Sequence, residues 1–222
     1  MYEDIIKVFE DSVTGEVFES IEFKLALKQL QTSKTNLKFL VGKAGTGKTF
    51  LINYLFKDNV YLATSLTREK LDSILVKNQL IVIDEAQLLD ESLVEYIRTL
   101  TDTKEYQFLL SIHLEDAQKL LKKEHFKTRD IDIIEIKLLT KEDMIRYINV
   151  TFLKNNITLM MKNSQFDKIY NYTKGNFRYI KKFMRVLFEL LQFAQDNNLT
   201  KYFDINDCLI TMTAIQLGLE ND

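Results

Sequence analysis

Three glycines, two lysines and two threonines fall within one stretch of eight residues in a chain that contains only six glycines. The stretch is Gly42-Lys43-Ala44-Gly45-Thr46-Gly47-Lys48-Thr49, which fits the pattern G-x-x-x-x-G-K-[ST]. Glycines let successive backbone N–H groups turn toward an anion, and the amino end of a helix favours negative charge. These residue types at this spacing predict a phosphate-binding loop.

The side chains after the last glycine predict how a nucleotide is held. Lys48 is expected to reach the outer phosphates, and the Thr49 hydroxyl is expected to ligate Mg²⁺. The pattern therefore predicts a bound nucleotide with Mg²⁺, and ATP as that nucleotide is what the family resemblance described below implies. The residues expected to contact the nucleotide are Gly42, Ala44, Gly45, Thr46, Gly47, Lys48, Thr49 and Phe50.

Two adjacent acids, Asp84 and Glu85, end the apolar run "LIVIDEAQ" at residues 80–87. Two acids in this position are on their own more typical of a solvated strand end. Together with the phosphate loop they predict function, because a metal-bound triphosphate needs a second carboxylate and hydrolysis needs a base. We therefore expect Asp84 to hold the hydrated metal and Glu85 to polarise the attacking water.

The elements that must position these residues alternate between strand and helix. Short apolar runs bounded by turn residues predict strands, and apolar residues at helical spacing predict helices. Asp90 is expected to cap one of the helices. Five strands alternating with helices predict a parallel sheet covered on both faces, an αβα sandwich. The expected strands are 36–42, 59–65, 79–87, 106–113 and 131–139.

Beyond about residue 140 the pattern is helical only. Helices are expected over 140–156, 163–173, 176–195 and 204–217. We therefore expect a nucleotide-binding domain at 1–140 and a small C-terminal helical lid at 141–222.

Composition limits the possible partners and compartments. Hydrophobic content of 46% and charged content of 28% indicate a folded chain. No apolar run is long enough to span a membrane, and the acidic start is unlike a signal peptide, so a cytoplasmic location is expected. The single cysteine, Cys208, is expected to be buried and excludes an intrachain disulfide. A net charge of -2 neither supports nor excludes binding of DNA.

Taken together, "GKAGTGKT", "LIVIDEAQ" and the later "KGNFRYIKKF" resemble an AAA+ P-loop ATPase. Within that group, from about residue 20 to about residue 195, the chain is similar to the ExeA, GspA and MshM type of secretion and pilus ATPases. Phe177 stands where that type usually has proline. The resemblance implies preference for ATP over GTP.

The same resemblance implies further site residues. Ser111, or His113 two residues later, occupies the place of the residue that senses the terminal phosphate. Arg178 occupies the place of a second sensor in the lid. Arg129 matches the position of an arginine finger that acts on a neighbouring subunit, which implies a homo-oligomer.

Three functions are consistent with these features. The first is a motor or assembly ATPase of an envelope machine for secretion, pilus assembly or DNA uptake, with a protein partner at the inner membrane. The second is a DNA-transaction ATPase similar to transposition regulators or helicase loaders. The third is an adaptor that binds the nucleotide without hydrolysing it.

Overall fold

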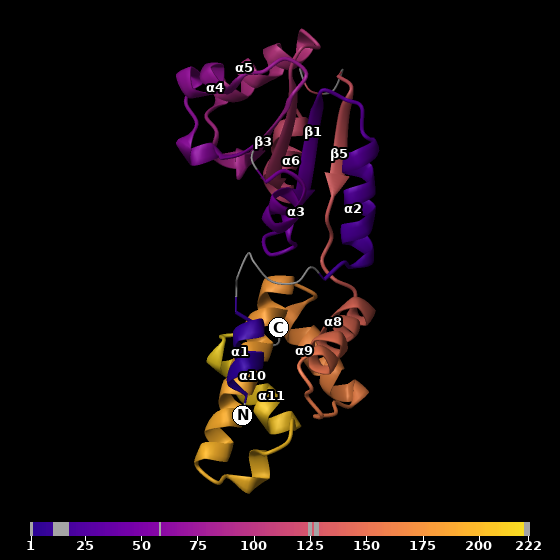
Figure 1. The fold of residues 1–222 in the computed structure, drawn as a ribbon, viewed down its shortest axis with the longest axis vertical. Helices are drawn as coiled ribbons and strands as arrows, with labels where there is room; N and C mark the ends of the chain where they lie inside the picture. The colour runs from indigo at the N-terminus through magenta and orange to yellow at the C-terminus, as the bar shows by residue number, and fades with distance from the viewer. Residues whose placement is uncertain (1, 11–17, 58, 124–125, 127–128, 220–222) are drawn as a thin grey trace. The chain divides into compact units, whose positions relative to one another are not determined.

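The computed structural model describes residues 2–10, 18–57, 59–123, 126 and 129–219 (Figure 1). Contacts between Cα atoms divide the chain into two units, one of Ile21–Lys137 and one that joins Met1–Ser20 to Leu138–Asp222. The C-terminal stretch of the second unit starts at Leu138, close to the expected start of the lid at residue 141. The second unit differs from the expected 141–222 domain because it also includes the first 20 residues.

All five strands of the Ile21–Lys137 unit form one parallel sheet, as the alternating pattern predicts. Their order across the sheet is β2-β3-β4-β1-β5. Because the strands are parallel, their carboxyl ends lie at one edge, where Gly42 pairs with His113 and Leu62 pairs with Asp84. The strands are β1 (Leu37–Gly42), β2 (Val60–Leu62), β3 (Leu80–Asp84), β4 (Gln107–His113) and β5 (Ile131–Glu135).

Helices cover both faces of this sheet. Alternate side chains of β1, β3 and β4 pack with α4 (Arg68–Ile74), α5 (Glu91–Asp102) and α6 (Leu114–Leu121) in one apolar cluster. The opposite face contacts α3 (Lys48–Leu55), and α2 (Ile21–Thr32) lies beside β5 (Figure 1). The expected αβα sandwich is therefore confirmed.

Short 3-10 turns end two of the strands earlier than the sequence pattern predicts. β2 passes into η1 (Ala63–Ser65), and β3 is followed after one residue by η2 (Ala86–Leu88). The Asp90 Oδ1 atom accepts a hydrogen bond of 2.7 Å from the Leu93 N–H, so the expected cap of α5 is confirmed. The turn η2 brings the residues after β3 back toward β4.

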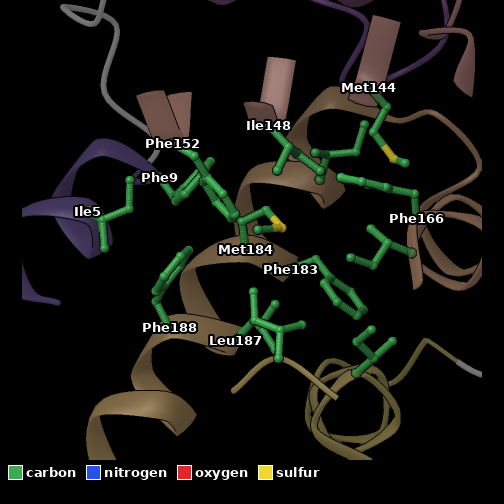
Figure 2. Packing of buried hydrophobic residues seen from close by; sticks show 14 of the residues in the cluster. Ile5, Phe9, Met144, Ile148, Phe152, Phe166, Phe183, Met184, Leu187 and Phe188 are labelled. Carbon is green, nitrogen blue, oxygen red and sulfur yellow. The ribbon is translucent and has the colours of Figure 1, made fainter. Parts of the chain in front are cut away.

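The second unit is a helical bundle built around α10 (Phe177–Asp196). It also contains α8 (Lys141–Lys154), α9 (Asn163–Thr173), η3 (Thr200–Tyr202) and α11 (Asp207–Gln216). Figure 2 shows the buried apolar side chains of this unit converging between these helices.

The first residues of the chain complete the core of this bundle. The short helix α1 (Glu3–Val8) carries Ile5, which is 2% exposed, and Phe9 follows it with 1% exposure. The Phe9 ring stacks on that of Phe188 with centroids 6.0 Å apart, and Figure 2 shows both side chains in the cluster. Burial of these apolar side chains explains why the N-terminal segment belongs to the helical unit.

Two further expectations concern the surface. Cys208 is exposed on α11, so the expectation that it is buried is wrong. Among the described residues, none of the helices has both the length and the apolar character needed to cross a membrane.

Candidate nucleotide-binding and catalytic site

The predicted phosphate loop connects β1 to α3 and places its glycines where other residues would be strained. Gly47 precedes α3 with φ 99°, in a region that L side chains rarely adopt. A Cβ atom on Gly42 would lie 2.6 Å from the Ile136 carbonyl oxygen and 2.7 Å from Thr46 Oγ1. Glycine is therefore needed at Gly42 for close packing and at Gly47 for the turn.

The loop is also closed by its own polar groups. Thr46 Oγ1 donates a 2.9 Å hydrogen bond to the Lys43 carbonyl oxygen. The backbone N–H groups of the first turn of α3 have no partners within the helix, so they and the helix dipole favour an anion at this point. The loop is thus a suitable cradle for the phosphates that the sequence pattern predicts.

Lys48 is held at the mouth of this loop. Its side chain is largely buried, and Nζ lies 2.9 Å from the Gly42 carbonyl oxygen and 3.2 Å from that of Lys43. A third contact of 3.5 Å joins Nζ to His113 Nδ1. The ammonium group is therefore already placed beside the loop in which a phosphate would lie.

The two residues expected to hold the metal are brought together. Thr49 Oγ1 donates a 2.7 Å hydrogen bond to Asp84 Oδ2, and Asp84 is 1% exposed. Asp84 Oδ1 accepts a 3.0 Å hydrogen bond from the Glu85 N–H. Mg²⁺ prefers oxygen ligands and takes only one or two from the protein when phosphates supply others, so this pair of side chains fits that ion.

Glu85 has an unusual backbone conformation. Its φ of 56° and ψ of 39° lie in the left-handed region, which costs a residue with a side chain roughly 1–3 kcal/mol. The side chain is 37% exposed, and Oε2 lies 3.4 Å from His113 Nε2 and accepts a hydrogen bond from Gln87 Nε2. The strained turn directs this carboxylate toward the end of β4 instead of leaving it on the outside of the strand.

The structure separates the two candidates for the first sensor. Ser111 is fully buried inside β4, and its Oγ has no hydrogen-bond partner among the described residues. His113, at the end of the same strand, contacts both Lys48 and Glu85. Of the two, His113 is therefore the residue that the fold brings to the phosphate loop.

Three other predicted residues are not among the contacts described above. Ala44 is exposed on the loop. Phe50 lies in the first turn of α3, and its ring packs against that of Phe23 with centroids 6.1 Å apart. Arg178 lies in the first turn of α10, where the Asn176 side chain caps the helix. Arg178 belongs to the helical unit, so the contacts within the Ile21–Lys137 unit do not test its role.

Arg129 lies just before β5, at the amino ends of the parallel strands, whereas the phosphate loop follows the carboxyl end of β1. The two therefore lie at opposite ends of the strands. Its Nη1 atom lies 2.7 Å from Asp102 Oδ1 at the end of α5. Arg129 is therefore too far along the sheet to serve the loop of its own chain. Any contact with a nucleotide would have to involve a neighbouring subunit.

Gln87 ends the stretch "LIVIDEAQ", and the sequence pattern predicts no role for it. Gln87 Nε2 donates to Glu85 Oε2, and Gln87 Oε1 accepts a 3.4 Å hydrogen bond from the His113 N–H. The only signal in the sequence was its position two residues after Glu85.

Comparison with known proteins supports the fold. No protein-family model matches the sequence, and no curated protein is significantly similar to it. Among solved structures, RuvB of Thermotoga maritima, described as a Holliday junction branch migration motor, has a TM-score of 0.60 with 17% identity over 89% of this chain and 68% of its own.

Two other solved structures are similar. A Walker-type ATPase of Pyrococcus abyssi has a TM-score of 0.61 with 14% identity over 87% of this chain and 78% of its own. A closed state of Hsp104 has a TM-score of 0.57 with 14% identity over 88% of this chain and 42% of its own. The chain has the fold of AAA+ P-loop ATPases, and the narrower resemblance to secretion and pilus ATPases is not confirmed.

Proposed function

We propose that this protein is a Mg²⁺-dependent ATPase that hydrolyses ATP to ADP and phosphate. The observation that carries the proposal is the 2.7 Å contact between Thr49 and Asp84 beside the loop that holds Lys48. The contact places a hydroxyl and a buried carboxylate where a metal on the outer phosphates would need them. The preference for ATP over GTP rests on the AAA+ fold and on the absence of an N-K-x-D motif from the sequence.

Each residue has a separate task in this proposal. The loop amides and Lys48 bind the phosphates, and Thr49 and Asp84 hold Mg²⁺. The metal ion, when bound, neutralises charge that develops on the phosphate oxygens. Glu85 accepts a hydrogen bond from the attacking water and orients it. Arg178 is proposed as the second sensor of the nucleotide. Arg129 is proposed as the arginine finger that acts on the nucleotide of a neighbouring subunit, in an assembly of several copies.

Two roles in the cell are compatible with this activity. The first is a motor or assembly switch for an envelope machine of secretion, pilus assembly or DNA uptake, reached through a protein partner at the inner membrane. It is supported by the order of the sequence motifs. A cytoplasmic location is part of this proposal.

A DNA-transaction role is the second candidate, and a specific observation favours it. Residues 168–188 include six basic residues and no acid. Four of them lie in the first half of α10, and Arg178 lies in its first turn, where the positive end of the helix dipole makes a cation unfavourable. Lys168 and Arg185 form ion pairs with Asp207 and Glu189. The likeness to RuvB, described as a branch migration motor, points the same way. The six residues are Lys168, Lys174, Arg178, Lys181, Lys182 and Arg185.

Phosphate release from ATP and Mg²⁺ tests the enzymatic proposal. The wild-type protein should turn over, whereas Glu85→Gln should bind Mg-ATP as tightly and lose at least about 100-fold in kcat. Undiminished turnover in Glu85→Gln would refute the assigned base. Nucleotide binding without turnover in the wild type, with DNA and with membrane vesicles, would instead support the non-hydrolysing adaptor.

The same assay separates the two roles. Stimulation by DNA, with DNA affinity that falls steeply as salt rises, would support the DNA-transaction role. Stimulation by inner-membrane vesicles but not by DNA would support the envelope machine.

A further inference from the structure

Gln87 connects the ends of two strands at the candidate catalytic site. It lies in η2, just after β3, and its amide reaches both the Glu85 carboxylate and the backbone N–H of His113 at the end of β4. Only one orientation of the amide satisfies both contacts, because the NH₂ group must face the carboxylate and the carbonyl must face the N–H. Gln87 is therefore fixed at both ends of its amide.

The His113 ring approaches the same carboxylate oxygen. The Lys48 ammonium group can only donate, so the His113 Nδ1 atom that faces it at 3.5 Å must accept. The proton of the neutral imidazole is then on Nε2, which lies 3.4 Å from Glu85 Oε2. Gln87 and His113 thus approach Oε2 together.

This arrangement leaves the two oxygens of Glu85 in different environments. Oε2 accepts a hydrogen bond from Gln87 and lies 3.4 Å from His113 Nε2, whereas no hydrogen bond from the described residues reaches Oε1. The partly exposed carboxylate is therefore held through one oxygen only.

We propose that Gln87 is a positioning residue for Glu85. It holds Oε2, together with His113, so that Oε1 points to the attacking water. The inference rests on the proposed ATPase function and extends it to a residue outside the P-loop motif and the acidic pair. Gln87 touches neither nucleotide nor metal in this proposal, so its loss should affect the rate of hydrolysis and not the binding of Mg-ATP.

The test compares Gln87→Met with a matched control, Gln118→Met, which alters an exposed glutamine on α6. Gln87→Met should lower kcat about tenfold and leave the Kd for Mg-ATP within about twofold, because only orientation is lost. Gln87→Glu, of the same shape, should lower kcat further, since a second carboxylate repels the first. Gln118→Met should change neither value. An unchanged or increased kcat in Gln87→Met would overturn the inference.

A second readout does not require turnover. The chain has two histidines, so the imidazole ¹⁵N signals of His113 can be assigned by comparison with a His125→Gln variant. We expect the Nε2–H tautomer for His113 and a shift of its signals in Gln87→Met but not in Gln118→Met. Signals that do not respond to Gln87→Met would overturn the inference, whether or not ATP is hydrolysed. A response in a protein that lacks turnover would support the positioning contact and refute the proposed ATPase activity.

Discussion

Thr49 Oγ1 donates a 2.7 Å hydrogen bond to Asp84 Oδ2, although the two residues are 35 positions apart in the chain. Thr49 belongs to the helix that follows β1, and Asp84 ends β3, with β4 lying between these strands in the sheet. The contact is possible because parallel strands bring their carboxyl ends to one edge. The topology of the sheet thus assembles a hydroxyl and a carboxylate that the sequence keeps apart.

This contact predicts how metal dependence should change in Thr49→Val. Valine keeps the shape of threonine and removes the hydroxyl, so one proposed ligand of Mg²⁺ is lost. The Kd for ATP in the presence of Mg²⁺ should rise about tenfold or more, while the Kd measured with EDTA should stay the same. Binding is measured by calorimetry under both conditions.

Thr49→Ser is the matched control for this prediction, because serine keeps the hydroxyl. It should retain most of the dependence on Mg²⁺. Equal loss of binding with and without the metal in Thr49→Val would show that the variant damages the loop itself.

Arg129 and Asp102 form an ion pair of 2.7 Å, which provides a control for the proposed finger. If Arg129 acts on a neighbouring subunit, Arg129→Ala should lower kcat by 10³-fold or more, an effect on the order of those known for such fingers, and leave ATP binding unchanged. Asp102→Ala removes the same ion pair but keeps the arginine, so its kcat should remain near that of the wild type. Equal loss of activity in both variants would assign Arg129 a structural role only.

Tyr147 predicts an alkaline limit to the stability of the helical unit. Burial raises the pKa of the Tyr147 hydroxyl above its ordinary value of 10, and a hydrogen bond with Thr151 opposes this only in part. Since the pKa is higher in the folded state, the contribution of the neutral tyrosine is complete below about pH 10 and is lost as the pH rises further. Wild-type stability should therefore fall more steeply than that of Tyr147→Phe above pH 10.

Urea unfolding followed by circular dichroism at several pH values measures this difference. One additional proton released on unfolding changes the free energy of unfolding by up to about 1.4 kcal/mol per pH unit. The two proteins should have parallel pH profiles between pH 7 and 9. Profiles that remain parallel up to pH 11 would contradict the burial of this hydroxyl.

Much of the sheet could be predicted from the sequence, because its strands are short apolar runs separated by amphipathic helices. The pairing of Thr49 with Asp84 also follows once the strands are known to be parallel. The place of residues 1–20 could not be predicted in this way. Ile5 and Phe9 are buried in the core of the helical unit, where Phe9 stacks on Phe188 of α10 from the far end of the chain, and no local sequence pattern predicts such packing.

The first sensor shows a second limit of the sequence. Ser111 and His113 lie two residues apart on the same face of β4, which ends at His113 as the pattern predicts. The pattern does not show that Ser111 is enclosed in the sheet while His113 contacts Lys48 and Glu85. The role of Gln87 could not be predicted either, because its contacts depend on the 3-10 turn that follows Glu85, and the sequence pattern does not predict that turn.

Titration with labelled ATP and Mg²⁺ of the wild-type protein, Lys48→Ala and Lys43→Ala tests the central claim most directly. Lys48 is buried at the loop and Lys43 is exposed on it, so the pair separates a specific contact from a general loss of charge. We expect saturable binding by the wild type and Lys43→Ala, and a Kd at least about tenfold higher in Lys48→Ala. Absence of saturable binding by the wild type, or equally tight binding by Lys48→Ala, would contradict the account.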